Sequence, residues 1–445
     1  MAEPKLHKEK HVKYWQRCLK SLLPTQYTST DSSRMTLGFF ILSALDLLGA
    51  GAETFPAKQR AEIRDWILKC QHPNGGFCGS PNHRFPDGCY VDVGEGRRVM
   101  DPANLPATFF ALLSLTFVEG LDEVRKGDAL RWLRSLQRPD GSFGELVTQE
   151  GAVEGGRDMR YCLTAVAVRW ILRGDEVVLV KEEDIDVERL VDHIRAGQTY
   201  DGGFSESSEH EAHAGYTYCA IAALSLLNRL PDLSLRMPKA EDPKSPRPVL
   251  TDLSLTIRWL VSRQVGYEDE EDTDEDAEPI IKPDGVYKEK NLVTGFTLED
   301  TEFVGLNGRC NKAADTCYAF WVAASLSMLG QDAAQILHSV AIRRFLFEQT
   351  QHMIGGFGKT PGAPPDIYHS YLGLAALAIM KEPGIKPLDP GLCISLQQKD
   401  IIGQLRKSAA VPSRIYWKHG NAFSIREDDP DFEQIMASSE EPCHM

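Results

Sequence analysis

Apolar residues along this chain recur at the spacing of α-helices, and strand-like alternation is nearly absent. Positions three and four residues apart fall on one face of a helix. One such segment contains Leu37, Phe40, Ile41, Ala44, Leu45 and Leu48. The hydrophobic pattern therefore predicts an all-α protein.

A short motif punctuates the predicted helices. It consists of a Gln, two or three further residues, a Gly-rich turn and a Phe, and its copies end at Phe77, Phe143, Phe204 and Phe357. The first three copies lie 66 and 61 residues apart (143 − 77 and 204 − 143). A fifth copy is expected to begin at Gln264 and to resume near 304–309. Each period then holds two helices joined by the turn, whose glycines supply positive φ where the outer helix ends.

Such hairpins stack because none can bury its apolar face alone. About six of them predict an α/α barrel of the α6–α6 type, although an open, curved solenoid gives the same sequence pattern. We expect residues 1–385 to form this barrel, with an acidic disordered insert at about 267–300, and residues 386–445 to form a partly flexible C-terminal extension. The starts of the inner helices should gather at one end of the assembly.

Charge and composition exclude some classes of function. The chain has 445 residues, 42% of them hydrophobic, and a formal net charge of −15, which argues against a surface that binds nucleic acid or anionic lipid. Nine of the acidic residues lie between Glu268 and Glu278, a composition typical of a solvated insert.

The ten cysteines lie mostly in apolar segments and lack the spacing of a disulfide scaffold, which indicates a reducing compartment. The first residues contain no apolar targeting segment, and no run of about 18 apolar residues occurs. We therefore expect a cytoplasmic protein without stable membrane insertion. Cys443 is third from the end, so the tail does not fit a C-a-a-X prenylation signal.

Three residues could bind a metal ion. Asp315, Cys317 and His369 supply the carboxylate, thiolate and imidazole that zinc takes in tetrahedral sites, and a catalytic site keeps its fourth position open. Asp315 and Cys317 are two residues apart, so they can converge on one ion only at a helix start, where Asp315 is also a good N-cap. An ordinary helix cap and a buried core cysteine explain the same spacing, and the pattern alone leaves both interpretations open.

Basic and phenolic residues surround the same helix start. Arg309 and Lys312 precede it, Tyr318 follows Cys317, and His213 opens another apolar helix. Cations and a phenol beside a helix N-terminus could hold a diphosphate. A solvated loop with two ordinary basic residues is the alternative.

The segments GRCNKAADTCYAFW, SEHEAHAGYTYC, GGRDMR and GGFGKTPGAPPDIYHSY resemble the signature segments of protein prenyltransferase β subunits, a resemblance that extends over roughly residues 11 to 385. It implies the α6–α6 barrel and a catalytic zinc ion held by Asp315, Cys317 and His369. It also implies that Arg160 lies near a bound peptide. The prenyl diphosphate would be held by His213, Arg309, Lys312 and Tyr318.

Within this family, three features are similar to members that transfer geranylgeranyl rather than farnesyl. Thr36 stands where farnesyl enzymes carry Trp, and a smaller residue leaves room for one more isoprene unit. Lys359 stands where they carry an Asp that helps bind magnesium. Its ammonium can neutralise the diphosphate charge itself, which makes Lys359 a further diphosphate-binding and catalytic residue, so magnesium should not be required. The tripeptide Asp-Thr-Cys at 315–317 is the third feature. Leu372 departs from the pattern, because an aromatic residue is expected there.

The resemblance thus implies a zinc-dependent enzyme of the type I geranylgeranyl class. A substrate thiolate would attack geranylgeranyl diphosphate, and the acceptor would be the cysteine of a C-terminal CaaX sequence ending in Leu, as in Rho/Rac-type small GTPases. The resemblance also implies an obligate α subunit shared with farnesyltransferase.

Other functions compete with this one. Within the family, the alternatives are a farnesyltransferase β subunit and then the Rab-specific type. Terpene cyclases share helical barrels but need an acidic motif, and the near matches at Asp272, Asp274, Asp276, Asp428 and Asp429 lie in hydrophilic segments that would not raise a carboxyl pKa. A non-catalytic helical-repeat protein is a third class, and bound zinc would separate it from a transferase.

Overall fold

The computed structural model describes residues 4–21, 31–81, 102–148, 150–173, 184–231, 249–250, 252–267 and 302–408, and the backbone of 414–418 and 421–425. The expected acidic insert lies outside these residues except for Tyr267. The candidate cyclase aspartates and Cys443 lie outside them as well.

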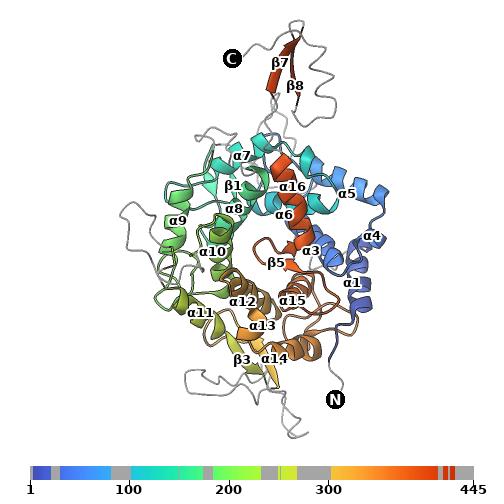
Figure 1. Ribbon diagram of the computed structural model, residues 1–445, viewed down its shortest axis with the longest axis vertical. Helices are drawn as coiled ribbons and strands as arrows, with labels where there is room; N and C mark the ends of the chain where they lie inside the picture. The colour runs from blue at the N-terminus through green and yellow to red at the C-terminus, as the bar shows by residue number, and fades with distance from the viewer. Residues whose placement is uncertain are drawn as a thin grey trace.

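Within the described ranges, six apolar helices form an inner ring (Figure 1). They are α3 (Arg34–Leu47), α6 (Leu105–Phe117), α8 (Met159–Arg173), α10 (Ala214–Leu226), α12 (Thr316–Met328) and α15 (Ile367–Ile379). Each packs against the next, and α15 packs back against α3. The ring is therefore closed, which decides between the barrel and the open solenoid. These helices are apolar all round because they are buried on both their outer and inner sides.

A second layer of helices surrounds the ring (Figure 1). It contains α1 (Lys8–Lys20), α5 (Ala57–Lys69), α7 (Lys126–Ser135), α9 (Val187–Ala196), α11 (Leu253–Val261) and α14 (Ser339–Arg344), which continues into the π-helical turn η7 (Phe345–Thr350). These helices are amphipathic. In α9, for example, Leu190, Val191 and Ile194 are buried while the charged residues face outward. Short helical segments link the layers: η1 (Asp31–Ser33), α4 (Gly51–Thr54), η3 (Leu121–Glu123) and α13 (Ala333–Ile336).

The repeated motif is a bridged turn. In four copies the Gln pairs with the Phe in an isolated antiparallel bridge: Gln71 with Phe77, Gln137 with Phe143, Gln198 with Phe204 and Gln351 with Phe357. In the fifth, β3 (Gln264–Tyr267) pairs with β4 (Phe303–Leu306), and Gln264 lies opposite Leu306. The prediction of a split copy at Gln264 is confirmed.

The Gln side chain of this motif ties each hairpin to the next one. Gln71 accepts a hydrogen bond from the Arg125 N–H at 3.1 Å and donates to its carbonyl at 3.3 Å. Gln137 makes the same pair of bonds with Asp186, at 2.7 and 2.9 Å. Arg125 and Asp186 are the N-cap residues of the next outer helices. Gly75 has a φ of +130°, and a Cβ there would lie 2.5 Å from the Asp128 carbonyl oxygen, so the turn packs directly on that helix.

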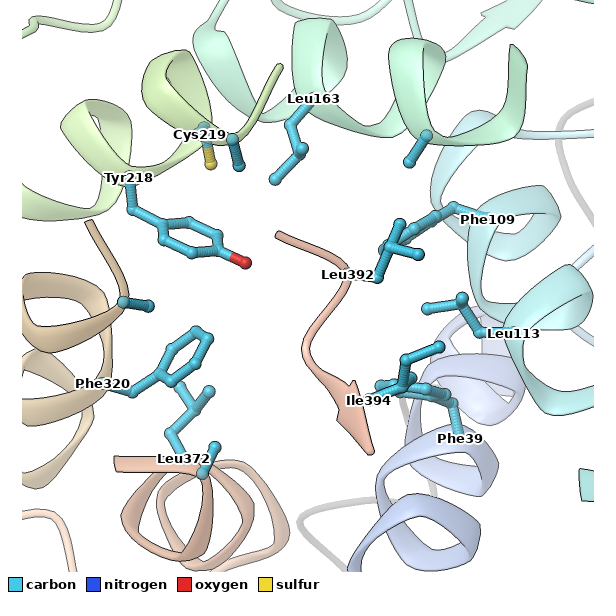
Figure 2. Close-up of a cluster of buried hydrophobic side chains, with 14 of the residues drawn as sticks. Phe39, Phe109, Leu113, Leu163, Tyr218, Cys219, Phe320, Leu372, Leu392 and Ile394 are labelled. Atoms are coloured by element: carbon cyan, nitrogen blue, oxygen red, sulfur yellow. The ribbon is translucent and has the colours of Figure 1, made fainter. Parts of the chain in front are cut away.

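A C-terminal hairpin enters the ring. Residues 388–395, here called the plug, contain the antiparallel strands β5 (Leu388–Asp389) and β6 (Ile394–Ser395). Figure 2 shows the plug inside the ring, with the side chains of Leu392 and Ile394 beside those of Phe109, Leu113 and Phe39. The Tyr218 hydroxyl donates to the Pro390 carbonyl at 2.9 Å, and the Tyr371 hydroxyl donates to that of Cys393. These bonds pair buried tyrosine hydroxyls with main-chain carbonyls of the plug.

The plug leads directly into α16 (Leu396–Ser408), which packs on α6 and α8. Two further antiparallel pairs are β1 (Leu146–Val147) with β2 (Val153–Glu154), and β7 (Arg414–Lys418) with β8 (Asn421–Ile425). Among the described residues, no helix combines the length and apolar character needed to cross a bilayer.

Candidate active site

The polar residues of the site stand at the N-termini of inner helices. His213 caps α10, Asp315 caps α12 and Asp366 caps α15. Each side chain accepts a hydrogen bond from a backbone N–H of the first turn, as N-cap residues do. Helix starts carry partial positive charge, so these ends of the helices favour anions.

Asp315, Cys317 and His369 come together as the sequence predicts. One ligand atom from each lies within 4.8 Å of the others, and the described part of the chain holds no second group of this kind. His369 Nε2 is 3.2 Å from Asp315 Oδ1. Asp315 Oδ1 also accepts from the Cys317 N–H at 2.8 Å. Asp315 is thus a helix cap and a potential ligand at once, so the two interpretations of its spacing do not exclude each other.

Binding of a divalent cation to the cluster would be coupled to the release of protons from Cys317 and His369. Burial and the neighbouring Asp315 raise the pKa of Cys317 well above its usual range. Burial disfavours the charged form of His369, but hydrogen bonds to Asp315 and Asp366 outweigh it and raise the pKa to about 9. At neutral pH both groups hold protons that a cation would replace.

The donor set fits zinc. Sulfur, nitrogen and oxygen ligands on three of four tetrahedral positions are typical of catalytic zinc sites. Two ligands about 2.0 Å from a tetrahedral ion are about 3.3 Å apart. The 3.2 Å between His369 Nε2 and Asp315 Oδ1 matches this separation.

Asp366 is a further residue of the site, and its role was not predicted from the sequence. Its Oδ2 lies 2.6 Å from His369 Nδ1, which directs Nε2 toward Asp315. Carboxylates commonly orient metal-binding histidines in this way. An Asp after Pro365 and three residues before a His, at a predicted helix start, was the available signal.

A cavity of about 490 Å³ adjoins the cluster, and Cys317 lies in its wall. The wall is mostly apolar and aromatic, and it includes Phe39, Phe40, Phe109, Phe110, Tyr216, Tyr218, Trp321 and Tyr368. Thr36 and Leu372 also line it, as do Gly391, Leu392 and Cys393 of the plug. The cavity is therefore suited to an apolar chain whose polar end lies beside the cluster.

The predicted diphosphate residues lie around the start of α12. His213 Nε2 is 3.2 Å from the Tyr318 hydroxyl, while Nδ1 accepts from Gly215 N–H. Nε2 therefore carries the proton, and the Tyr318 O–H can donate to a ligand. Burial and the nearby Arg309 lower the pKa of His213 to about 4, so it is neutral at pH 7.

The cations are more exposed. Arg309 lies 3.2 Å from the Glu211 carboxylate, and Lys312 is in the same loop with an exposed side chain. Lys359 Nζ is 4.0 Å from Asp315 Oδ2. Arg160 lines the cavity and makes two hydrogen bonds, of 2.8 and 3.0 Å, with the buried carboxylate of Asp158. That pairing raises the pKa of Arg160 and holds its guanidinium in place.

Comparisons with known proteins agree with this geometry. A family model described as "Prenyltransferase alpha-alpha toroid domain" matches residues 6–394. The chain is 31% identical over 401 residues to the geranylgeranyl transferase type-1 subunit beta of Arabidopsis thaliana, covering 87% of this chain and 89% of that protein. It is 27% identical over 385 residues to the protein farnesyltransferase subunit beta of Schizosaccharomyces pombe, covering 83% and 78%. A solved structure of Candida albicans protein geranylgeranyltransferase-I complexed with GGPP superposes with a TM-score of 0.69 at 25% identity, covering 89% of this chain and 98% of that one.

Proposed function

The chain belongs to the prenyltransferase α/α toroid family as a protein prenyltransferase β subunit, and we propose that it serves the type I geranylgeranyl reaction. In this proposal it transfers a C20 group from geranylgeranyl diphosphate to the cysteine of C-terminal CaaX sequences ending in Leu. The observation that carries the proposal is the Asp315–Cys317–His369 cluster beside a large aromatic cavity.

Asp315, Cys317 and His369 would hold the zinc ion, and Asp366 would orient His369. Bound there, zinc would act as a Lewis acid that keeps an incoming substrate cysteine deprotonated at neutral pH. The buried carboxylate and thiolate of the chain lower the charge of the site, which keeps the attacking sulfur nucleophilic.

The aromatic cavity would hold the prenyl chain with C1 near the cluster. Thr36 supports a C20 chain, because its small side chain leaves space that a Trp would fill. Reaction forms a bond from the substrate sulfur to C1 and breaks the bond from C1 to the diphosphate oxygen. The electron pair of that bond leaves with the diphosphate.

The departing diphosphate would be stabilised by the groups at the start of α12. The Tyr318 hydroxyl is free to donate to it because His213 Nε2–H already donates to the Tyr318 oxygen. Arg309, Lys312 and Lys359 would neutralise its charge. Lys359, 4.0 Å from Asp315, supplies positive charge where a magnesium ion would otherwise be needed.

A β subunit implies an α subunit, and we propose that this partner is the one shared with farnesyltransferase. Proteins of the Rho/Rac type are the expected acceptors. The test is to co-express the chain with its α subunit and to offer C15 or C20 diphosphate with peptides ending in C-a-a-Leu or C-a-a-Ser, with and without magnesium. We expect C20 transfer to the Leu peptide, retained without magnesium.

The farnesyl reaction is the second candidate, supported by the 27% identity to a farnesyltransferase subunit, which is below the 31% identity to a geranylgeranyl transferase type-1 subunit. Preference for C15 and a terminal Ser in the same assay would replace the type I assignment. Substituting Cys317→Ala should abolish bound zinc and turnover while the helical fold remains. Cys162→Ala, which removes a buried cysteine outside the cavity lining, is the matched control and should keep one zinc equivalent. Equal zinc content in both variants would refute the metal site.

A further inference from the structure

One cysteine beside the proposed diphosphate site is open to solvent. Of the cysteines in the described ranges, only Cys310 is exposed; Cys70, Cys78, Cys162, Cys219 and Cys317 are buried, and Cys18 and Cys393 are half-buried. Burial raises the pKa of Cys18, Cys162, Cys219 and Cys393, which makes their thiols poor nucleophiles. Among these described cysteines, Cys310 is therefore the one most open to an oxidant in solution.

A buried guanidinium lies directly behind this cysteine. Arg263 is only 4% exposed, and its Nη2 donates to Cys310 Sγ at 3.2 Å. Its Nη1 has no hydrogen-bond partner in the part of the chain that the structure describes. No carboxylate of the described residues forms an ion pair with Arg263, whose cationic plane stacks on Trp259 at 4.6 Å.

A buried cation without a counter-anion is costly, so a hydrogen-bond acceptor or an anion placed beside the free Nη1 of Arg263 would be stabilised. An oxygen atom bonded to the Cys310 sulfur could accept a hydrogen bond there, because Nη1 still has N–H groups to donate. Arg263 is thus a second feature, independent of the cysteine's exposure, that points to an anion at this position.

The cysteine also lies within the loop that carries the proposed diphosphate cations. Residues 307–312 connect β4 to the approach of α12, with Cys310 between Arg309 and Lys312. The Asn307 N–H donates to the Arg263 carbonyl at 2.9 Å, and Asn307 Nδ2 donates to the Lys312 carbonyl at 3.0 Å. A group added to Cys310 therefore changes the charge and shape of the loop itself.

We propose that Cys310 is a site of reversible oxidative modification by a peroxide. The Cys310 sulfur attacks one peroxide oxygen, a sulfur–oxygen bond forms, the oxygen–oxygen bond breaks, and water leaves with the thiol proton; sulfur loses two electrons and the peroxide gains them. A small thiol such as glutathione then displaces water from the sulfenic acid and forms a mixed disulfide. The consequence for activity rests on the proposed function: the negatively charged glutathione adduct repels prenyl diphosphate from Arg309 and Lys312.

The test uses the zinc-loaded complex with its α subunit, treated with hydrogen peroxide and the sulfenic acid trap dimedone. Peptide mass mapping should find the trap on Cys310, and on Cys162 only at background level. This readout needs no prenyl substrate, so it separates failure of the modification site from failure of the proposed enzyme function. Labelling of Cys310 no faster than that of Cys162 would overturn the proposal.

Two variants sharpen the test. After treatment with peroxide and glutathione, the complex without substitutions should lose transfer and regain it with dithiothreitol. Cys310→Ser should keep basal transfer and be insensitive to the same treatment. Arg263→Gln should slow trapping at Cys310 by roughly tenfold, about the value of one charge-assisted hydrogen bond. Arg263→Lys, which keeps the charge, should restore much of the rate and serves if the Gln variant folds poorly. Unchanged trapping in a folded Arg263→Gln variant refutes the role of the guanidinium.

Discussion

The outer layer of helices is joined between its last repeat and α1, and Gln351 lies at the centre of these contacts. Its Oε1 accepts from His7 N–H at 2.9 Å and from His11 Nε2 at 3.0 Å, and its Nε2 donates to the Lys5 carbonyl at 3.2 Å. His11 is fully buried, and its Nδ1 accepts from Gly356 N–H at 3.2 Å. The proton of the neutral ring is therefore on Nε2, directed at Gln351.

The variant Gln351→Ala removes these bonds and leaves a buried imidazole N–H without a partner. An unsatisfied buried donor costs about 1–3 kcal/mol, and each lost bond to a more exposed main-chain group costs about 0.5 kcal/mol. The sum is a loss of about 2–4 kcal/mol in the free energy of holding α1 on the ring. Gln137→Ala is the matched control. Its two bonds to Asp186 are exposed and no buried histidine depends on them, so it should cost about 1 kcal/mol.

Hydrogen exchange measured by mass spectrometry follows this contact locally. Since about 1.4 kcal/mol is a factor of ten, amides of residues 8–20 should exchange roughly 30 to 1,000 times faster in Gln351→Ala, while those of α8 change little. In Gln137→Ala the exchange of α1 should stay unchanged. If α1 exchanges alike in both variants, the Gln351 amide does not hold α1 on the outer layer.

Three further predictions concern the site and the core. Asp366→Asn should weaken zinc binding about 10- to 100-fold without unfolding the protein, because His369 loses the carboxylate that orients its ring. Competition with a chelator measures the zinc affinity, and an unchanged affinity would contradict this role of Asp366. Burial lowers the pKa of His11 from 6.5 to about 4. Neutral His11 therefore contributes about 3 kcal/mol to the free energy of unfolding, which is fully present above pH 6.5 and is lost as pH falls toward 4. The unfolding temperature of His11→Gln should depend less on pH between 4 and 6.5 than that of the unsubstituted protein, and parallel curves for the two proteins would count against this. Thr36→Trp should shift the ratio of kcat/KM from C20 toward C15 diphosphate, and an unshifted ratio would mean that Thr36 does not limit chain length.

Much of the site could be predicted from the sequence, because its chemistry depends on local structure. Asp315 and Cys317 meet at a helix start because the side chain of an N-cap residue turns back over the first turn, where it accepts a hydrogen bond from the N–H of Cys317. His213 was likewise predicted at the start of an apolar helix and caps α10. Asp366 was missed because its role appears only when the orientation of the His369 ring is known.

The sequence by itself determined the helices, the bridged turns between them and the grouping of polar residues at helix starts, since each rests on interactions between residues close in the chain. The tertiary structure decided that the ring closes, because contact of α15 with α3 depends on the summed rotation of all the hairpins, which no single repeat encodes. It also decided that the plug lines the cavity. Nothing near Leu392 in the sequence indicates that its side chain completes a pocket whose aromatic wall comes from helices up to about 350 residues earlier in the chain.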